Sequence, residues 1–122
     1  MEIVADEQAA IEAALRRLAA AAHLVVTTGG TGIAIRDVTP EATRAVCTRL
    51  VEGISERMRS EGAKKTTLAM LSRGVCGICG TSLIINLPGS PRAAVESLQA
   101  VIELLPHALD LLQGKTSHTA LD

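Results

Sequence analysis

Hydrophobic positions along the chain switch between helical and extended spacing. After Asp6, a typical N-cap residue, apolar side chains recur every three or four positions, which predicts an amphipathic helix. A run of aliphatic and β-branched residues then predicts a buried strand over residues 24–28. Helical spacing returns after Pro40 and continues to Glu61, with Gly53 as the expected break between two helices.

The second half of the chain repeats this alternation. Ser90 and Pro91 predict a helix start, because an N-cap residue is followed by proline at the first helical position. This last helix is expected to be interrupted at Pro106 and to stop at Gly114. Before it, the sequence predicts one short helix or strand and two extended segments, at residues 67–71, 75–79 and 82–86.

Alternating strands and helices predict a layered α/β domain. In such domains the loops that follow the strands meet at one edge of the sheet, where ligands usually bind. The 122 residues are enough for one domain, which we place at residues 1–114. Residues 115–122 are polar and are expected to form a flexible tail.

Composition narrows the classes of function. The chain has no Phe, Tyr or Trp, which excludes stacking of single-stranded nucleic acid on aromatic rings. The formal net charge is −1 and no basic run is long enough to bind a polyanion, so we expect no nucleic-acid partner. The sequence shows no signal-peptide pattern and no apolar segment of transmembrane length. We therefore expect a cytoplasmic protein without a membrane partner.

Three cysteines, Cys47, Cys76 and Cys79, are expected to be reduced, because their number is odd and no secretion signal is present. The C-x-x-C pair formed by Cys76 and Cys79 raises the alternative of a metal or redox protein. A structural zinc site normally needs two more ligands, and thioredoxin-like chemistry places the motif at a helix start. Here the pair lies beside a predicted strand, so this alternative is disfavoured.

The most informative segment for function connects the first predicted strand to the next helix. Gly29, Gly30 and Gly32 can adopt positive φ and let a ligand approach main-chain N–H groups. Thr39 as N-cap and Pro40 at the first helical position then start a helix, and a helix N-terminus favours anions. This combination is typical of a site for a phosphorylated ligand.

Asp37 lies between these two anion-attracting elements. A carboxylate there disfavours phosphate unless a divalent cation bridges the two groups, so its presence indicates Mg²⁺. The alternative interpretation is a tight connection in which Asp37 only accepts hydrogen bonds from nearby amides. The segment has neither the dinucleotide fingerprint nor the P-loop pattern. Both interpretations remain open on the residues alone.

Residues 27–43, 71–73 and 83–91 together resemble the MoaB/Mog molybdopterin-binding family, which includes the molybdopterin adenylyltransferases. The resemblance extends from Ile3 to Gly114. It implies a three-layer α/β/α domain with a mainly parallel sheet, a homotrimer or hexamer, and a role in molybdenum cofactor biosynthesis. The adenylyltransferases of the family use Mg²⁺ and ATP to adenylylate molybdopterin and release pyrophosphate.

The resemblance also implies which residues form the site. Asp37 matches the principal catalytic acid, and Asp6 falls where the family has a second acid, although Ala5 replaces the usual proline. The two carboxylates are also the expected Mg²⁺ ligands. The expected nucleotide-binding residues are Gly29, Gly30, Thr31 and Gly32, and the expected molybdopterin-binding residues are Ser72, Asn86, Pro88, Gly89 and Ser90.

One departure from the family concerns the N-terminus. Family members normally begin with an additional strand, helix and strand of about 45 to 50 residues, consistent with the usual domain size. We therefore expect a domain that is incomplete at its N-terminus and lacks part of the pterin pocket. The predicted function is Mg²⁺-ATP-dependent adenylylation of molybdopterin. The alternatives are a non-catalytic MoaB-like molybdopterin-binding protein and an inactive fragment of the enzyme.

Overall fold

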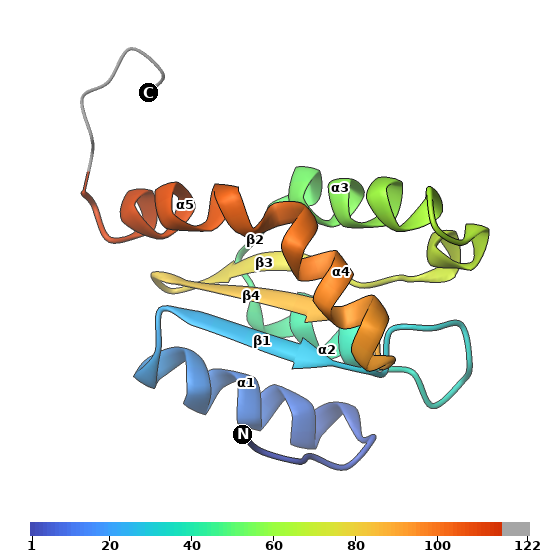
Figure 1. The fold of residues 1–122 in the computed structure, drawn as a ribbon. Coiled ribbons are helices and arrows are strands. Elements are labelled where there is room, and N and C mark those ends of the chain that lie inside the picture. The colour runs from blue at the N-terminus through green and yellow to red at the C-terminus, as the bar shows by residue number, and fades with distance from the viewer. Residues whose placement is uncertain (116–122) are drawn as a thin grey trace.

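The computed structural model describes residues 1–115, which form a four-stranded sheet between two layers of helices (Figure 1). Most of the predicted tail, residues 116–122, lies outside the described residues. No helix within residues 1–115 is long and apolar enough to cross a membrane. The elements are α1 (Gln8–Ala21), β1 (Leu24–Thr28), α2 (Thr39–Val46), β2 (Arg49–Leu50), α3 (Glu52–Ala63), η1 (Thr67–Leu71), β3 (Cys76–Cys79), β4 (Ser82–Leu87), α4 (Pro91–Val101), η2 (Ile102–Leu104) and α5 (Leu105–Leu112).

The sheet is mixed, with the strand order β1-β4-β3-β2. β1 and β4 pair in parallel, whereas β3 is antiparallel to both β4 and β2. The predicted α/β class is confirmed. β1, β4 and β2 run in one direction, and β3 runs against them. β3 connects to β4 through a two-residue turn formed by Gly80, with φ 62°, and Thr81. Such a short turn can join only antiparallel strands.

The central strand β4 is buried at all six positions and supplies side chains to both layers. Leu83, Ile85 and Leu87 belong to the core cluster formed with α3, α4 and α5. Ile84 points the other way and packs with Leu15 of α1 in a second cluster. Figure 1 shows the same division, with α1 and α2 on one face of the sheet and α3, α4 and α5 on the other. Alternate side chains of β4 therefore contribute to a core cluster on each face of the sheet.

The helical segment predicted after Pro40 divides earlier than expected. α2 ends at Val46, and the chain then forms the short strand β2, in which Leu50 pairs with Gly77 of β3. Gly53 lies in the first turn of α3 and not between two helices. The apolar spacing in the sequence fits a helix, so pairing with a distant strand decides the conformation here.

Two predicted helix N-caps are displaced. The N-cap of α1 is Glu7 and not Asp6, and the N-cap of α2 is Val38 because Thr39 is already helical. Neither N-cap residue makes a side-chain cap hydrogen bond. The predicted N-cap Ser90 is confirmed, since its Oγ accepts a hydrogen bond from a main-chain N–H in the first turn of α4 at 3.4 Å.

Candidate functional site

The loops that follow the parallel strands β1 and β4 meet at one edge of the sheet. Gly29 N donates a hydrogen bond to Leu87 O, with a distance of 3.0 Å. A Cβ added to Gly89 would lie 3.3 Å from Gly29 Cα, so the two loops are in close contact through glycine. Residues 29–38, which we call the glycine loop, therefore lie beside the end of β4, at the edge where a ligand site was expected.

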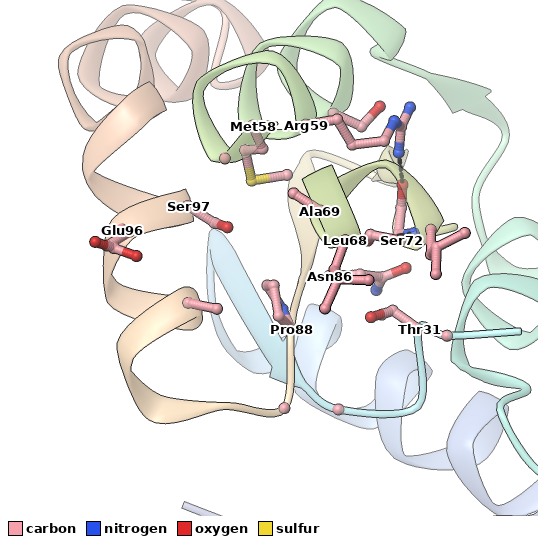
Figure 2. A pocket seen from close by; sticks show the side chains of 18 of the residues that line it. Thr31, Met58, Arg59, Leu68, Ala69, Ser72, Asn86, Pro88, Glu96 and Ser97 are labelled. Carbon is pink, nitrogen blue, oxygen red and sulfur yellow. Dashed lines mark hydrogen bonds between the residues drawn. The ribbon is translucent and has the colours of Figure 1, made fainter. Parts of the chain in front are cut away.

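A cavity of about 450 Å³ lies at this edge (Figure 2). Its walls come from the glycine loop, from α3 and η1, from the loop before β3 and from the start of α4. In Figure 2, Met58 and Arg59 lie on one side of the cavity, and Thr31 lies across from them. Of the residues predicted for the site, those that line this cavity are Gly29, Gly30, Thr31, Gly32, Asp37, Ser72, Asn86, Pro88 and Gly89.

The glycine loop is folded tightly against the start of α2. Gly30 has a φ of 69°, and a Cβ at this position would collide with the hydroxyl of Thr39. Thr39 N donates to Gly30 O at 3.2 Å. A Cβ on Gly32 would lie 2.8 Å from Asp37 Oδ2. Glycine at these two positions is therefore what allows the loop to approach the helix and the acidic side chain.

Four consecutive main-chain N–H groups in this loop, at residues 30–33, have no hydrogen-bond acceptor among residues 1–115. The N–H groups on either side are bonded, because Gly29 N donates to Leu87 O and Ala34 N donates to Asp37 Oδ2. Main-chain amides without a protein partner are satisfied by water or by a ligand. Several such amides beside a helix start form an arrangement suited to phosphate.

Asp37 is half-buried in the wall of the cavity at the end of the glycine loop. Its Oδ2 accepts a hydrogen bond from Ala34 N at 3.1 Å, and its own N donates to Ala34 O at 2.9 Å. Asp37 thus accepts a hydrogen bond from a nearby amide in a tight turn, as the alternative interpretation of this segment predicted. Its Oδ1 accepts no hydrogen bond from the described part of the chain, so one oxygen remains available to a cation. The turn and a role as metal ligand are compatible.

Arg73 connects the glycine loop to the start of α2. Its Nε donates to Gly32 O at 2.8 Å and its Nη2 donates to Asp37 O at 2.6 Å. Its Nη1 donates to Glu41 Oε2 at 2.6 Å, which forms an ion pair. This pair holds the pKa of the Glu41 carboxyl below its ordinary value and raises the pKa of Arg73. Arg73 lies in one of the segments that resemble the family, and no role was predicted for it.

Asn86 lies in the floor of the cavity with 2% of its surface exposed. Its Oδ1 accepts from Val75 N at 3.1 Å, and its Nδ2 donates to Thr27 Oγ1 at 3.0 Å and to Thr43 Oγ1 at 2.9 Å. Both N–H groups of the amide are therefore used within the chain. Ser72 differs, because its Oγ accepts one hydrogen bond from a main-chain N–H and its own hydroxyl hydrogen has no acceptor among residues 1–115.

Arg59 is the second half-buried arginine of the described chain and was not predicted as a site residue. Its Nη1 donates to Gly74 O at 2.8 Å, the contact drawn in Figure 2, and the chain offers it no carboxylate partner within residues 1–115. Arg59 lines the cavity, so its remaining N–H groups are available to an anion. Because α3 carries several charged side chains, its sequence gave no signal that singles out this position.

Two residues predicted for the site lie outside the cavity. Ser90 is exposed and caps α4. Asp6 is exposed and lines a different cavity of about 580 Å³ along α1 and β1, to which Gly29 and Gly30 also contribute. The structure therefore does not bring Asp6 and Asp37 into one cavity.

Residues 1–107 match the protein family described as "Probable molybdopterin binding domain". The chain belongs to this family. It is 49% identical over 115 residues to the molybdopterin adenylyltransferase of Helicobacter pylori (strain J99), and this match covers 93% of the chain and 65% of that relative. It is 41% identical over 132 residues to the molybdopterin adenylyltransferase of Escherichia coli (strain K12), and this match covers 97% of the chain and 68% of that relative.

Solved structures of the molybdopterin-binding family give the same fold. The crystal structure of the molybdopterin biosynthesis enzyme MoaB from Thermus thermophilus is similar, with a TM-score of 0.84 and 54% sequence identity. The similarity covers 90% of this chain and 70% of that one. The chain spans about two thirds of the length of the two curated adenylyltransferases described above, 65% and 68%.

The cysteines of this family member do not form a metal site among residues 1–115, where no three His, Cys, Asp or Glu side chains gather. Cys76 is buried, and Cys47 and Cys79 are half-buried free thiols. Burial raises the pKa of Cys47 to about 11 and that of Cys76 to about 12. Such thiols are protonated at neutral pH, which is unfavourable for redox chemistry.

Proposed function

We propose that this chain carries the nucleotide-binding part of a molybdopterin adenylyltransferase, which uses Mg²⁺ and ATP to adenylylate molybdopterin and releases pyrophosphate. The observation that carries the proposal is the group of four N–H groups at residues 30–33 that have no acceptor within residues 1–115, beside Asp37 in the wall of the cavity. The two curated relatives named as molybdopterin adenylyltransferases support the same activity.

In this proposal the glycine loop binds the phosphates of ATP. The N–H groups of residues 30–33 donate to phosphate oxygens, and the positive end of α2 adds a favourable field. Glu41, in the first turn of α2, repels phosphate little because its charge is paired with Arg73. Asp37 fits Mg²⁺, which commonly takes one or two carboxylate ligands and completes its shell with phosphate oxygens and water. When bound, Mg²⁺ would offset charge on the leaving pyrophosphate.

Molybdopterin is proposed to occupy the α3 and η1 side of the cavity. Apolar side chains there suit the face of a heterocycle, and Ser72 and Arg59 offer hydrogen-bond donors. Pro88 and Gly89 shape the opposite wall, and Ser90 is retained as a candidate contact that would have to be reached from outside the cavity. The apolar lining residues on the α3 and η1 side are Met58, Leu68, Ala69 and Leu71.

The reaction needs positioning more than a protein nucleophile. A terminal phosphate oxygen of molybdopterin forms a bond to the α-phosphorus of ATP, and the bond between that phosphorus and the bridging oxygen breaks. Pyrophosphate leaves with the electron pair of that bond. Arg59 would hold the attacking phosphate, while the amides of residues 30–33 would hold the triphosphate in line with it.

The test is a transfer assay with molybdopterin, Mg²⁺ and ATP labelled at the α-phosphate. We expect labelled, adenylylated molybdopterin and one pyrophosphate per transfer. The positive control is the full-length Helicobacter pylori relative, which is named a molybdopterin adenylyltransferase and of which the chain covers 65%. If the control forms product and the chain neither forms product nor binds Mg²⁺-ATP, the proposal is wrong.

A second candidate function is binding of molybdopterin without transfer. The observation that favours it is the position of Asp6, which is exposed and lies outside the cavity that contains Asp37. A site that contains only one of the two expected carboxylates, Asp37 without Asp6, has fewer of the predicted ligands for Mg²⁺. Binding of molybdopterin that does not change when Mg²⁺-ATP is added, together with no transfer, would favour this candidate over the enzyme.

We also propose that the chain assembles as a homotrimer. Several large apolar side chains of the glycine loop and η1 are exposed in the single chain, which is typical of surfaces that are covered in an assembly. Sedimentation equilibrium is expected to give three times the mass of the chain, and a monomer at all concentrations would contradict the proposal. The exposed side chains are Ile33, Ile35, Leu68 and Met70.

A further inference from the structure

We propose that Arg73 is a positioning residue that holds the glycine loop in the conformation that binds phosphate. This inference rests on the proposed nucleotide site but concerns a residue to which no role has been assigned. Arg73 lies in the loop between η1 and β3, far from the glycine loop in sequence. It makes contact with that loop on both sides of residues 33–36.

Three main-chain carbonyl groups of the glycine loop point toward Arg73. Its main-chain N donates to Thr31 O at 2.7 Å, and its Nε donates to Gly32 O at 2.8 Å. Its Nη2 donates to Asp37 O at 2.6 Å. A single residue thus binds the loop before and after the exposed turn at residues 33–36. Hydrogen bonds from a charged guanidinium are stronger than those between neutral groups.

These contacts also fix where the N–H groups of the loop point. In a trans peptide unit the C=O and the following N–H point in opposite directions, and no cis peptide bond occurs in the described chain. Because the carbonyl groups of Thr31 and Gly32 face Arg73, the N–H groups of residues 32 and 33 face away from it. Gly32 lines the cavity of about 450 Å³, and Arg73 does not line it. Arg73 lines a neighbouring cavity of about 390 Å³.

The ion pair with Glu41 holds Arg73 itself in place. Glu41 Oε2 accepts from Nη1 at 2.6 Å, and Oε1 accepts from Nη2 at 3.3 Å, so the pair is bidentate. Glu41 belongs to the first turn of α2, whose start contacts Gly30 through Thr39. Arg73 therefore locks three segments together: the glycine loop, the start of α2 and the loop before β3. Lysine could not replace it, because one ammonium group cannot reach these separated acceptors.

The experiment compares Arg73→Gln with Arg57→Gln. Arg57 is a matched control, since its Nε also donates to a carbonyl, Ala100 O at 2.7 Å, and its Nη2 pairs with Glu103 at 3.7 Å, but it lines no part of either cavity. We expect Arg73→Gln to weaken Mg²⁺-ATP binding by about tenfold or more, as measured by calorimetry, and Arg57→Gln to change it less than about twofold.

A second readout separates this inference from the proposed function. ¹⁵N relaxation of the protein without nucleotide reports the order of the main chain at residues 30–33 directly. Loss of order in Arg73→Gln but not in Arg57→Gln supports the positioning role, even if the unchanged chain proves not to bind Mg²⁺-ATP. Unchanged order and unchanged affinity in Arg73→Gln would overturn it.

A conservative variant covers the case in which Arg73→Gln does not fold. Arg73→Lys keeps the positive charge beside Glu41 and is expected to fold, with nucleotide affinity still lowered several-fold because the side-chain contacts to Gly32 O and Asp37 O are lost. Full affinity and full loop order in Arg73→Lys would show that only the charge matters, which would overturn the positioning role.

Discussion

The helices α2 and α4 both begin with a hydroxyl residue followed by proline, yet the two starts differ in structure. Ser90 is exposed and caps α4, since its Oγ accepts from Ala93 N at 3.4 Å. Thr39 is 7% exposed and makes no cap, and its hydroxyl lies against Gly30. The start of α4 is held by local contacts, whereas the start of α2 is built into the glycine loop.

This difference shows what a helix-start pattern can and cannot predict. Thr-Pro and Ser-Pro each predict that a helix begins, and both helices do begin there. The pattern does not predict whether the amides at that start belong to a site. At the start of α2, the arrangement of the amides depends on residues distant in sequence, above all on Arg73 and its ion pair with Glu41. The predictions below test whether the site depends on the start of α2 more than on the start of α4.

The largest effect is expected for Asp37→Asn. The amide can still accept the hydrogen bond from Ala34 N but loses the charge that suits Mg²⁺, so transfer should fall by about 100-fold or more while molybdopterin binding is largely kept. Asp110→Asn, an exposed position on α5, is the control. Equal loss of transfer and of molybdopterin binding would mean that Asp37 is structural only.

Gly30→Ala should be the most destabilising change at the start of α2. Alanine at φ 69° costs about 1–2 kcal/mol, and the collision with Thr39 adds about 1–3 kcal/mol. Gly80→Ala is the matched control, because Gly80 has φ 62° and no atom of the described residues lies within 4 Å of an added Cβ. Denaturant unfolding of both variants measures the difference. Equal losses would show that Thr39 moves away freely.

Arg59→Gln is expected to separate the two halves of the cavity. Removing a charged donor should weaken molybdopterin binding by about tenfold, since hydrogen bonds to charged groups contribute about 1.5–3 kcal/mol. Mg²⁺-ATP binding, which we assign to the glycine loop, should change by less than about twofold. Fluorescence titration with molybdopterin and calorimetry with Mg²⁺-ATP give the two affinities. A larger loss of affinity for Mg²⁺-ATP than for molybdopterin would place Arg59 in the nucleotide-binding half of the cavity.

Ser90→Ala tests the start of α4. Loss of the N-cap should lower the free energy of unfolding by about 1 kcal/mol, and Mg²⁺-ATP affinity should not change, because Ser90 lies outside the cavity. The comparison is made with Ser60→Ala, an exposed hydroxyl within α3. Weaker nucleotide binding in Ser90→Ala would show that both helix starts serve the nucleotide.

The smallest effect concerns pH. Arg73 holds the pKa of Glu41 below its ordinary value of 4.5, so Glu41 remains ionised in the folded protein where it is protonated in the unfolded chain. The contribution of the pair is therefore full above pH 4.5 and is lost as the pH falls through the lowered pKa. It should be below about 1 kcal/mol, because both side chains are more than a third exposed.

The unfolding free energies of the unchanged protein and of Glu41→Gln, measured across this pH range, check that expectation. Their difference should be constant above pH 4.5 and shrink below it. A difference that grows as the pH falls would have the wrong sign and would exclude the stabilising ion pair.

Local patterns predicted most of the fold. The buried strand β4, the cap at Ser90 and the interruption of the last helix near Pro106 all depend on residues close in sequence. The missed strand lies where distant pairing decides. β2 forms because residues 49 and 50 pair with β3.

The site shows the same division. The glycines and Asp37 were predicted as site residues from their spacing, and all of them line the cavity. Arg73 and Arg59 were assigned no role, because nothing in their own segments shows which arginine meets a carbonyl or a cavity. Asn86 was predicted to bind molybdopterin, but the N–H groups of its amide donate to Thr27 of β1 and Thr43 of α2 and so connect these two elements.

The most direct test of the central claim is an ¹⁵N NMR titration of the protein with Mg²⁺-ATP. We predict that the largest chemical-shift changes occur at the N–H groups of residues 30–33, which have no acceptor in the described chain. Smaller changes should occur in the first turn of α2, and the first turn of α4 should change least. Changes confined to α4, or none at residues 30–33 at saturating nucleotide, would contradict the account.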